Sequence, residues 1–201
     1  MPAFKEVRPG KEDFNMFESH AIMKYICSVR DLPQHWYPTK ATTPEEIELR
    51  AKMDIYLDWH HANIRMGAGG YMFRKYFSGL MDKNGVWAST FAVNESWTIL
   101  KRTLTQITRI WLPKDSAKRY MFGDQPSIAD LSLACEIANL TAMKFPLKEE
   151  YPTVHKWYYE SMMTIPGFKE VTDKGIIPLS KNIPMLEEML KDVDRDAKPK
   201  L

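Results

Sequence analysis

The sequence predicts an all-α protein with a short β-hairpin in front of its helices. Apolar residues recur at helical spacing through most of the chain after residue 18, whereas the strand-like region is confined to residues 2–16. A strong helix-start pattern and a later helix that is apolar nearly all round point to the same fold class. With 201 residues, the chain is long enough to bury a hydrophobic core.

The N-terminal region predicts two strands and a helix. Ala3–Val7 and Asp13–Met16 flank Pro9–Gly10, a pair that favours a turn. Glu18–Val29 follows, with apolar residues at helical spacing. Two strands alone are only marginally stable in water, so we expect the hairpin to pack on another element.

The clearest helix start is Thr43–Glu46. It combines a Thr N-cap, Pro at the first helical position and Glu three residues after the cap. We expect a long helix from there to Met66. Gly67–Gly70 should kink or interrupt it, and Tyr71–Phe77 should resume it.

The second half of the chain predicts further helices, followed by a polar tail. Met81–Ala92 reads as a loop, and Ser127–Phe145 as a helix at the centre of the domain, because it is apolar nearly all round. The other expected helical segments are Val93–Leu112, Pro152–Thr164, a short helix ending at Lys174, and a turn or two within Ile183–Val193.

These segments predict a division of the chain into four parts. A hairpin and helix occupy residues 1–30, a Pro-rich linker residues 31–42, an all-helical domain residues 43–178, and a partly disordered C-terminal extension residues 179–201.

Composition excludes several classes of function. The net charge is +2 with acidic and basic residues interspersed, which does not favour nucleic acid as a partner. No apolar run approaches the roughly 20 residues that span a bilayer, and the N-terminus lacks the apolar core of a secretory signal. Cys27 and Cys135 lie in apolar helical patterns, so we expect buried, unreactive thiols and a cytoplasmic location.

One motif is specific. Phe122–Leu131 contains a Ser-x-x-Asp capping box, in which Ser127 and Asp130 each accept a hydrogen bond from the other's backbone amide. Capping matters here because the expected helix is buried and water cannot satisfy its first amides.

Together with its neighbours, this motif resembles the one that opens the central C-terminal helix of the glutathione transferase family. Phe17–Ile22, Trp36–Pro38 and Tyr56–Arg65 are similar to further segments of theta-like members. The resemblance covers about residues 2 to 175. It implies the helical C-terminal domain together with only the end of the thioredoxin-like N-terminal domain.

The resemblance also implies a partial glutathione site. Pro2 matches the position of a cis-proline that precedes the hairpin in the family, and Glu18 and Ser19 match residues that hold the γ-glutamyl end of glutathione. Phe17 departs from the family, which usually has Ser or Thr there. The family's catalytic Ser, Tyr or Cys has no counterpart in this chain, so we assign no catalytic residue.

A second-substrate pocket is implied at His61 and Arg65. The matching arginine in theta-like proteins reaches the electrophile, and residues four apart share a helix face. A plain polar stripe is the alternative interpretation. We expect no metal, because His60 and His61 are adjacent, diverge by about 100° on a helix, and have no evident third ligand.

Three functions remain open. The first is a non-catalytic interaction or scaffold domain, as a homodimer or in a larger complex, because the family usually dimerises through the helix at Thr43–Met66. The second is part of an active theta-like transferase that conjugates glutathione, as co-substrate, to a hydrophobic electrophile; no other cofactor is expected. The third is a protein that holds a ligand without chemistry.

Overall fold

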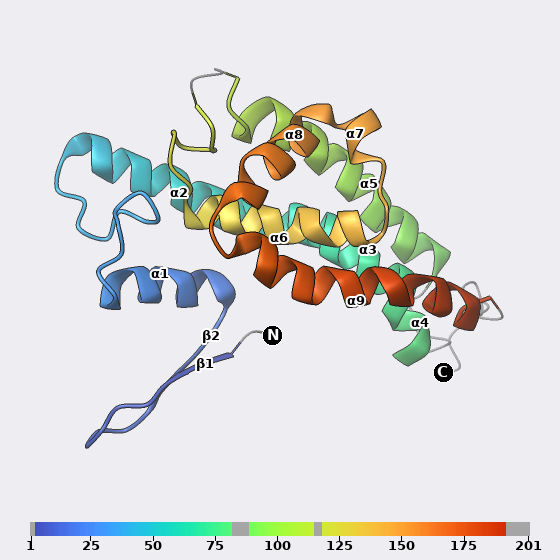
Figure 1. Cartoon of the computed structure of the whole chain (residues 1–201), viewed down its shortest axis with the longest axis horizontal. Helices are drawn as coiled ribbons and strands as arrows, with labels where there is room; N and C mark the ends of the chain where they lie inside the picture. The colour runs from blue at the N-terminus through green and yellow to red at the C-terminus, as the bar shows by residue number, and fades with distance from the viewer. Residues whose placement is uncertain (1–2, 82–88, 115–117, 192–201) are drawn as a thin grey trace.

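The computed structural model describes residues 3–81, 89–114 and 118–191. It confirms the predicted fold class: a bundle of helices with a two-stranded hairpin at one end (Figure 1). Helix α6 lies at the centre, in contact with α1, α2 and α9. The elements are β1 Ala3–Glu6, β2 Phe14–Phe17, α1 Ser19–Val29, α2 Pro44–Ala62, α3 Gly70–Met72, α4 Ser78–Met81, α5 Thr90–Gln106, α6 Ile128–Ala142, α7 Leu147–Glu150, α8 Pro152–Glu160 and α9 Phe168–Met189.

Several helices are extended by turns of different width. In the described part of the chain, three π-helical turns widen the hydrogen-bond spacing and one 3-10 turn narrows it: η1 Arg65–Gly69, η2 Phe73–Phe77, η4 Ile107–Trp111 and η5 Met162–Thr164. None of the helices in the described ranges is long and apolar enough to cross a membrane.

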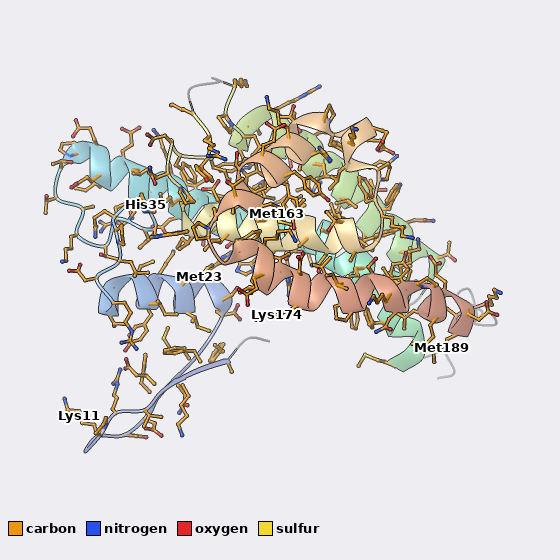
Figure 2. All side chains as sticks on the ribbon, in the orientation of Figure 1. Lys11, Met23, His35, Met163, Lys174 and Met189 are labelled. Atoms are coloured by element: carbon orange, nitrogen blue, oxygen red, sulfur yellow. The ribbon has the colours of Figure 1, made fainter. Side chains whose placement is uncertain are left out.

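The hairpin packs on α1, as the sequence requires. The antiparallel strands pair Ala3 with Phe17 and Glu6 with Phe14. Tyr25 of α1 lies against the ring of Phe14, with 5.2 Å between centroids, and its hydroxyl donates to Glu6 Oε2 at 2.8 Å. The hairpin tip, marked by Lys11, extends away from the bundle (Figure 2).

The linker after α1 is tied to the start of α6. The Trp36 carbonyl accepts from the Ile128 amide at 3.0 Å, and the His35 ring lies 2.6 Å from the Pro126 carbonyl oxygen. Tyr37 donates to Asp54 of α2 at 3.0 Å. The linker therefore joins α2 and α6 instead of running free between them.

Helix α2 begins as predicted and ends earlier than predicted. Thr43 and Glu46 form the expected capping box. The helix stops at Ala62, because Asn63 takes φ −122° and ψ −91°. The predicted continuation to Met66 and the predicted break at Gly67–Gly70 are both wrong: the break comes at Asn63, and the glycines lie inside helical turns.

Gly67 explains why glycines occupy these turns. A Cβ built on Gly67 would lie 2.8 Å from Leu100 Cα, so the η1 backbone contacts α5 directly. The glycines serve close helix packing instead of chain reversal.

Helices α5 and α9 differ from their predicted bounds. Ser89 caps α5, so residues 90–92 are helical instead of part of the loop; residues 82–88 lie outside the described residues. Helix α9 continues to Met189, well past the predicted end at Lys174 and through the predicted boundary at residue 178. Ile183 and Leu186 stabilise this extension by packing on Tyr76. The tail from residue 192 lies outside the described residues.

The start of α6 is fully enclosed. Ser127 and Asp130 are 0% exposed. The Ser127 amide and hydroxyl donate to Asp130 Oδ2 at 3.0 and 2.7 Å, and the Met121 amide donates to Oδ1 at 3.0 Å. Burial raises the pKa of Asp130 to about 6, and the bonds from Met121 and Ser127 limit the rise.

This geometry predicts unequal effects at the two capping boxes. At pH 7.5, Ser127→Ala should lower the free energy of unfolding by about 1–2 kcal/mol, because a buried carboxylate loses a donor and buried amides lose their cap. Thr43→Ala is the matched control; Thr43 is exposed, so water replaces the hydroxyl and the loss should be about 0.5 kcal/mol. Urea unfolding measures both; equal losses contradict the account.

Candidate functional site

Polar side chains meet where α1, α2 and α6 come together. We call His20 of α1 and His60 and His61 of α2 the histidine cluster. Beside it, Arg65 of η1 and Glu136 of α6 form an ion pair. These five residues come from four elements, of which α6 is far from the other three in the sequence.

The predicted glutathione residues lie at the start of α1. Glu18 precedes the helix with φ +71° and ψ 110°, a left-handed φ that costs a non-glycine residue on the order of 1–3 kcal/mol. Ser19 is the first residue of α1, and the Glu18 side chain at the N-cap makes no capping hydrogen bond. Strained backbone at a helix start with available amides fits an anionic ligand group. Pro2 lies outside the described residues.

The histidine cluster links the start of α1 to the end of α2. The His20 ring lies 4.3 Å from the ring of His61 and 5.0 Å from that of His60, between centroids. His20 is buried, and this burial, with His60, His61 and Lys24 nearby, lowers the pKa of His20 to about 3. His20 is therefore neutral at physiological pH, which lets three imidazoles lie close together.

A chain of polar contacts leads from the core to the surface. The Tyr56 hydroxyl lies 3.3 Å from His60 Nδ1, and His60 Nε2 lies 3.7 Å from Glu136 Oε1. Arg65 Nη1 donates to the same oxygen at 2.7 Å. This hydrogen bond, with the charge of Glu136, raises the pKa of Arg65. Buried Glu136 and half-exposed Arg65 thus form a charged pair at the surface of the helical domain.

His61 and Arg65 do not share a helix face as predicted. Their four-residue spacing would align them on one helix, but α2 breaks at Asn63, between them. His61 contacts His20 and His60, whereas Arg65 contacts Glu136. None of the contacts recorded among the described residues joins His61 to Arg65 directly; His60 and Glu136 connect the two groups.

Sequence reasoning missed His20 and Glu136 as members of this site. Glu136 carried a usable signal: apart from the capping Asp130 it is the one carboxylate in the sequence of a helix expected to be buried, and such residues are rarely buried without a partner. His20 carried none, because its role depends on how α1 docks against α2.

The two cysteines differ. Cys27 is buried, as expected, and burial raises the pKa of its thiol. Cys135 is exposed, so its predicted burial is wrong; it lies on a side of α6 where Leu131 and Asn139 are also only partly covered. Although Cys135 reaches the surface, the protein around its thiol removes part of the water there. This desolvation, together with the charge of Glu136, raises the pKa of Cys135, and a raised pKa disfavours the reactive thiolate.

Within residues 3–81, 89–114 and 118–191, no group of three or more His, Cys, Asp or Glu side chains has an arrangement that could hold a metal ion.

Comparison with known proteins gives the family. Residues 90–158 match the glutathione S-transferase C-terminal domain. Glutathione S-transferase T1 of Arabidopsis thaliana is 34% identical over 182 residues, which cover 84% of this chain and 70% of the relative. The chain belongs to the glutathione transferase family. Its curated relatives place it among the theta-like members.

Other glutathione transferases agree and show how much of the family's length the chain spans. Glutathione S-transferase T2 of Arabidopsis thaliana is 36% identical over 183 residues, covering 85% of this chain but only 29% of the relative. The human theta-2 transferase structure superimposes with a TM-score of 0.69 at 22% identity, covering 86% of this chain and 66% of that one. At this identity the structural match supports the fold alone.

The lowered pKa of His20 predicts acid sensitivity. In the unfolded chain the His20 ring takes up a proton near pH 6.5, whereas in the folded chain it does so only near pH 3. The stability that His20 contributes is therefore present above pH 6.5 and is lost as the pH falls toward 3.

His20→Gln removes this proton uptake. Between pH 7 and pH 5 the variant should lose less unfolding free energy than the wild type, by on the order of 1 kcal/mol. Urea unfolding at the two pH values measures the difference. A His20 C2–H resonance that titrates near pH 6.5 in the folded protein would show that the ring is not buried in this way.

Proposed function

We propose that this chain supplies the helical half of a glutathione transferase site. In this proposal Glu18 and Ser19 hold the γ-glutamyl end of glutathione, and a hydrophobic electrophile lies beside His61 and Arg65. The observation that carries it is the 4.3 Å contact between the rings of His20 and His61, because it brings the start of α1 next to the end of α2.

Related structures support glutathione as the co-substrate. The human theta-2 transferase has been solved in complex with glutathione, and a human theta-class transferase with the glutathione conjugate of 1-menaphthyl sulfate. A start of α1 without a side-chain cap suits a carboxylate, since its free amides can donate to one.

The chemistry that this site would serve is nucleophilic substitution by the glutathione thiolate. A base takes the proton of the glutathione thiol, the thiolate sulfur bonds to an electrophilic carbon, and the leaving group departs with its electron pair. We assign the activation of the thiol to no described residue of this chain, and neither cysteine has a lowered pKa. The 201 residues alone should therefore bind glutathione without appreciable turnover. A cytoplasmic location remains part of the proposal.

Glutathione binding tests the assignment directly. Titrating ¹⁵N-labelled protein with glutathione should shift the amide signals of Glu18 and Ser19, with a dissociation constant in the millimolar range because one anchored end gives little affinity. Ser19→Ala should weaken binding several-fold. Shifts that avoid α1, or that persist unchanged in Ser19→Ala, contradict the site.

A second function, an interaction or scaffold domain, is favoured by exposed apolar residues. Val7 and Phe17 of the hairpin region are 71% and 63% exposed. On α2, Ile47 and Ile55 are 46% and 60% exposed and lie eight residues apart, so they share an outward face with Ala51 between them. We propose that a second copy covers this face of α2 in a homodimer.

Substitution on α2 tests the dimer. The wild type should sediment as a dimer, and Ile55→Glu should sediment as a monomer, because a charge cannot be buried there unpaired. Ile110→Glu, at a 65% exposed residue of η4, is the matched control and should remain dimeric. A monomeric wild type, or a dimeric Ile55→Glu variant, rules out this interface.

A further inference from the structure

We propose that Glu136 is a positioning residue: its buried carboxylate fixes the guanidinium of Arg65 at the surface of the candidate site. The proposal rests on the proposed function for what Arg65 meets there. The ion pair itself, and the way the backbone is arranged around it, are features of the described structure.

Glu136 lies where a carboxylate is costly. It is 1% exposed, and its neighbours along α6 include the fully buried Leu133 and Ile137. Burying a charge costs several kcal/mol unless a partner compensates it. Arg65 is that partner at 2.7 Å. Glu136 Oε2 has no hydrogen-bond partner among the described residues, so the carboxylate depends on what reaches Oε1.

The backbone before Arg65 is arranged to bring it to Glu136. Asn63 leaves helical geometry, and its side chain donates to the Trp59 carbonyl at 2.8 Å, which closes the last turn of α2. The chain then re-enters the wider π-helical turn η1 at Arg65. Breaks of this kind change the direction of the side chains that follow, and π-helical turns are frequent at functional sites.

Gly69 leaves room for the ion pair. A Cβ built on Gly69 would lie 3.1 Å from Glu136 Oε2 and 3.5 Å from Arg65 Cδ. The first distance is closer than an ordinary van der Waals contact, so an added Cβ would force the carboxylate to shift by a few tenths of an ångström. The burial of Glu136, the helix break at Asn63 and the space at Gly69 therefore all bear on the ion pair between Arg65 and Glu136.

A fixed guanidinium has a functional advantage. Arginine has a long, flexible side chain, and ordering it during ligand binding costs free energy. Here Glu136 orders it beforehand, while the Arg65 side chain remains 58% exposed. Its donors are therefore already oriented for hydrogen-bond acceptor atoms of a second substrate.

The first test observes Arg65 in the 201-residue protein by NMR. In the wild type, the guanidinium should give separate, slowly exchanging N–H signals at low temperature, since a fixed group rotates slowly. Glu136→Gln should average them to the signals of an exposed arginine. Glu95→Gln is the matched control: it removes the carboxylate that pairs with Arg74 at 2.9 Å and should leave the Arg65 signals unchanged.

Gly69→Ala gives an independent variant if Glu136→Gln unfolds. It keeps both charges but shifts the carboxylate slightly, so the Arg65 N–H signals should exchange faster than in the wild type while circular dichroism stays that of the wild type. Arg65 signals that remain separate in a folded Glu136→Gln protein, or that are unchanged in Gly69→Ala, overturn the proposal.

The second test measures conjugation of glutathione to 1-menaphthyl sulfate, whose glutathione conjugate a human theta-class transferase binds, by a transferase in which these residues form the helical half. Glu136→Gln should raise the KM for the electrophile about tenfold and leave the KM for glutathione unchanged. Adding Glu136→Gln to Arg65→Ala should cause no further loss, because Glu136 acts through Arg65. Equal changes in both KM values, or additive losses, contradict a positioning role. Absence of conjugation by this transferase across a panel of electrophiles would reject the transferase proposal, while the NMR test would still decide the role of Glu136.

Discussion

Helix α6 is enclosed along most of its length, so the amides of its first turn must be satisfied by the protein itself. Ser127 and Asp130 do this with both residues fully buried, and Asp130 also fixes the loop at Met121. The linker joins the same place through Trp36. Because α1, α2 and α9 all contact α6, the position of its first turn sets the frame on which the candidate site is built.

The candidate site is carried by one more polar group on the same helix. Glu136 lies about two turns after the cap and receives Arg65 from η1. His60 lies near the same carboxylate. The ring of His20 contacts the ring of His60, so α1 is joined to this group of side chains. The residues that would hold the two substrates therefore reach the site from separate elements, and one buried carboxylate connects them.

The features that could be predicted from the sequence are those set by residues close together in the chain. The caps at Thr43 and Ser127 are local patterns, and both form. The packing of Gly67 against α5 and the length of α9 could not be predicted, because they depend on the distant residues Leu100 and Tyr76. For the site, the family resemblance identified Glu18, Ser19, His61 and Arg65 as candidates, but their grouping depends on long-range contacts of His20 and Glu136.

The candidate site requires that α1 lies against α2, because this contact brings the expected glutathione-binding residues next to the expected electrophile-binding residues. Nuclear Overhauser measurements between the ring protons of His20 and His61 test it most directly. We expect clear cross-peaks, since the ring centroids lie 4.3 Å apart. Their absence, in a protein whose α2 and α6 amides show the expected helical contacts, would mean that α1 does not lie there and that the candidate site is not formed.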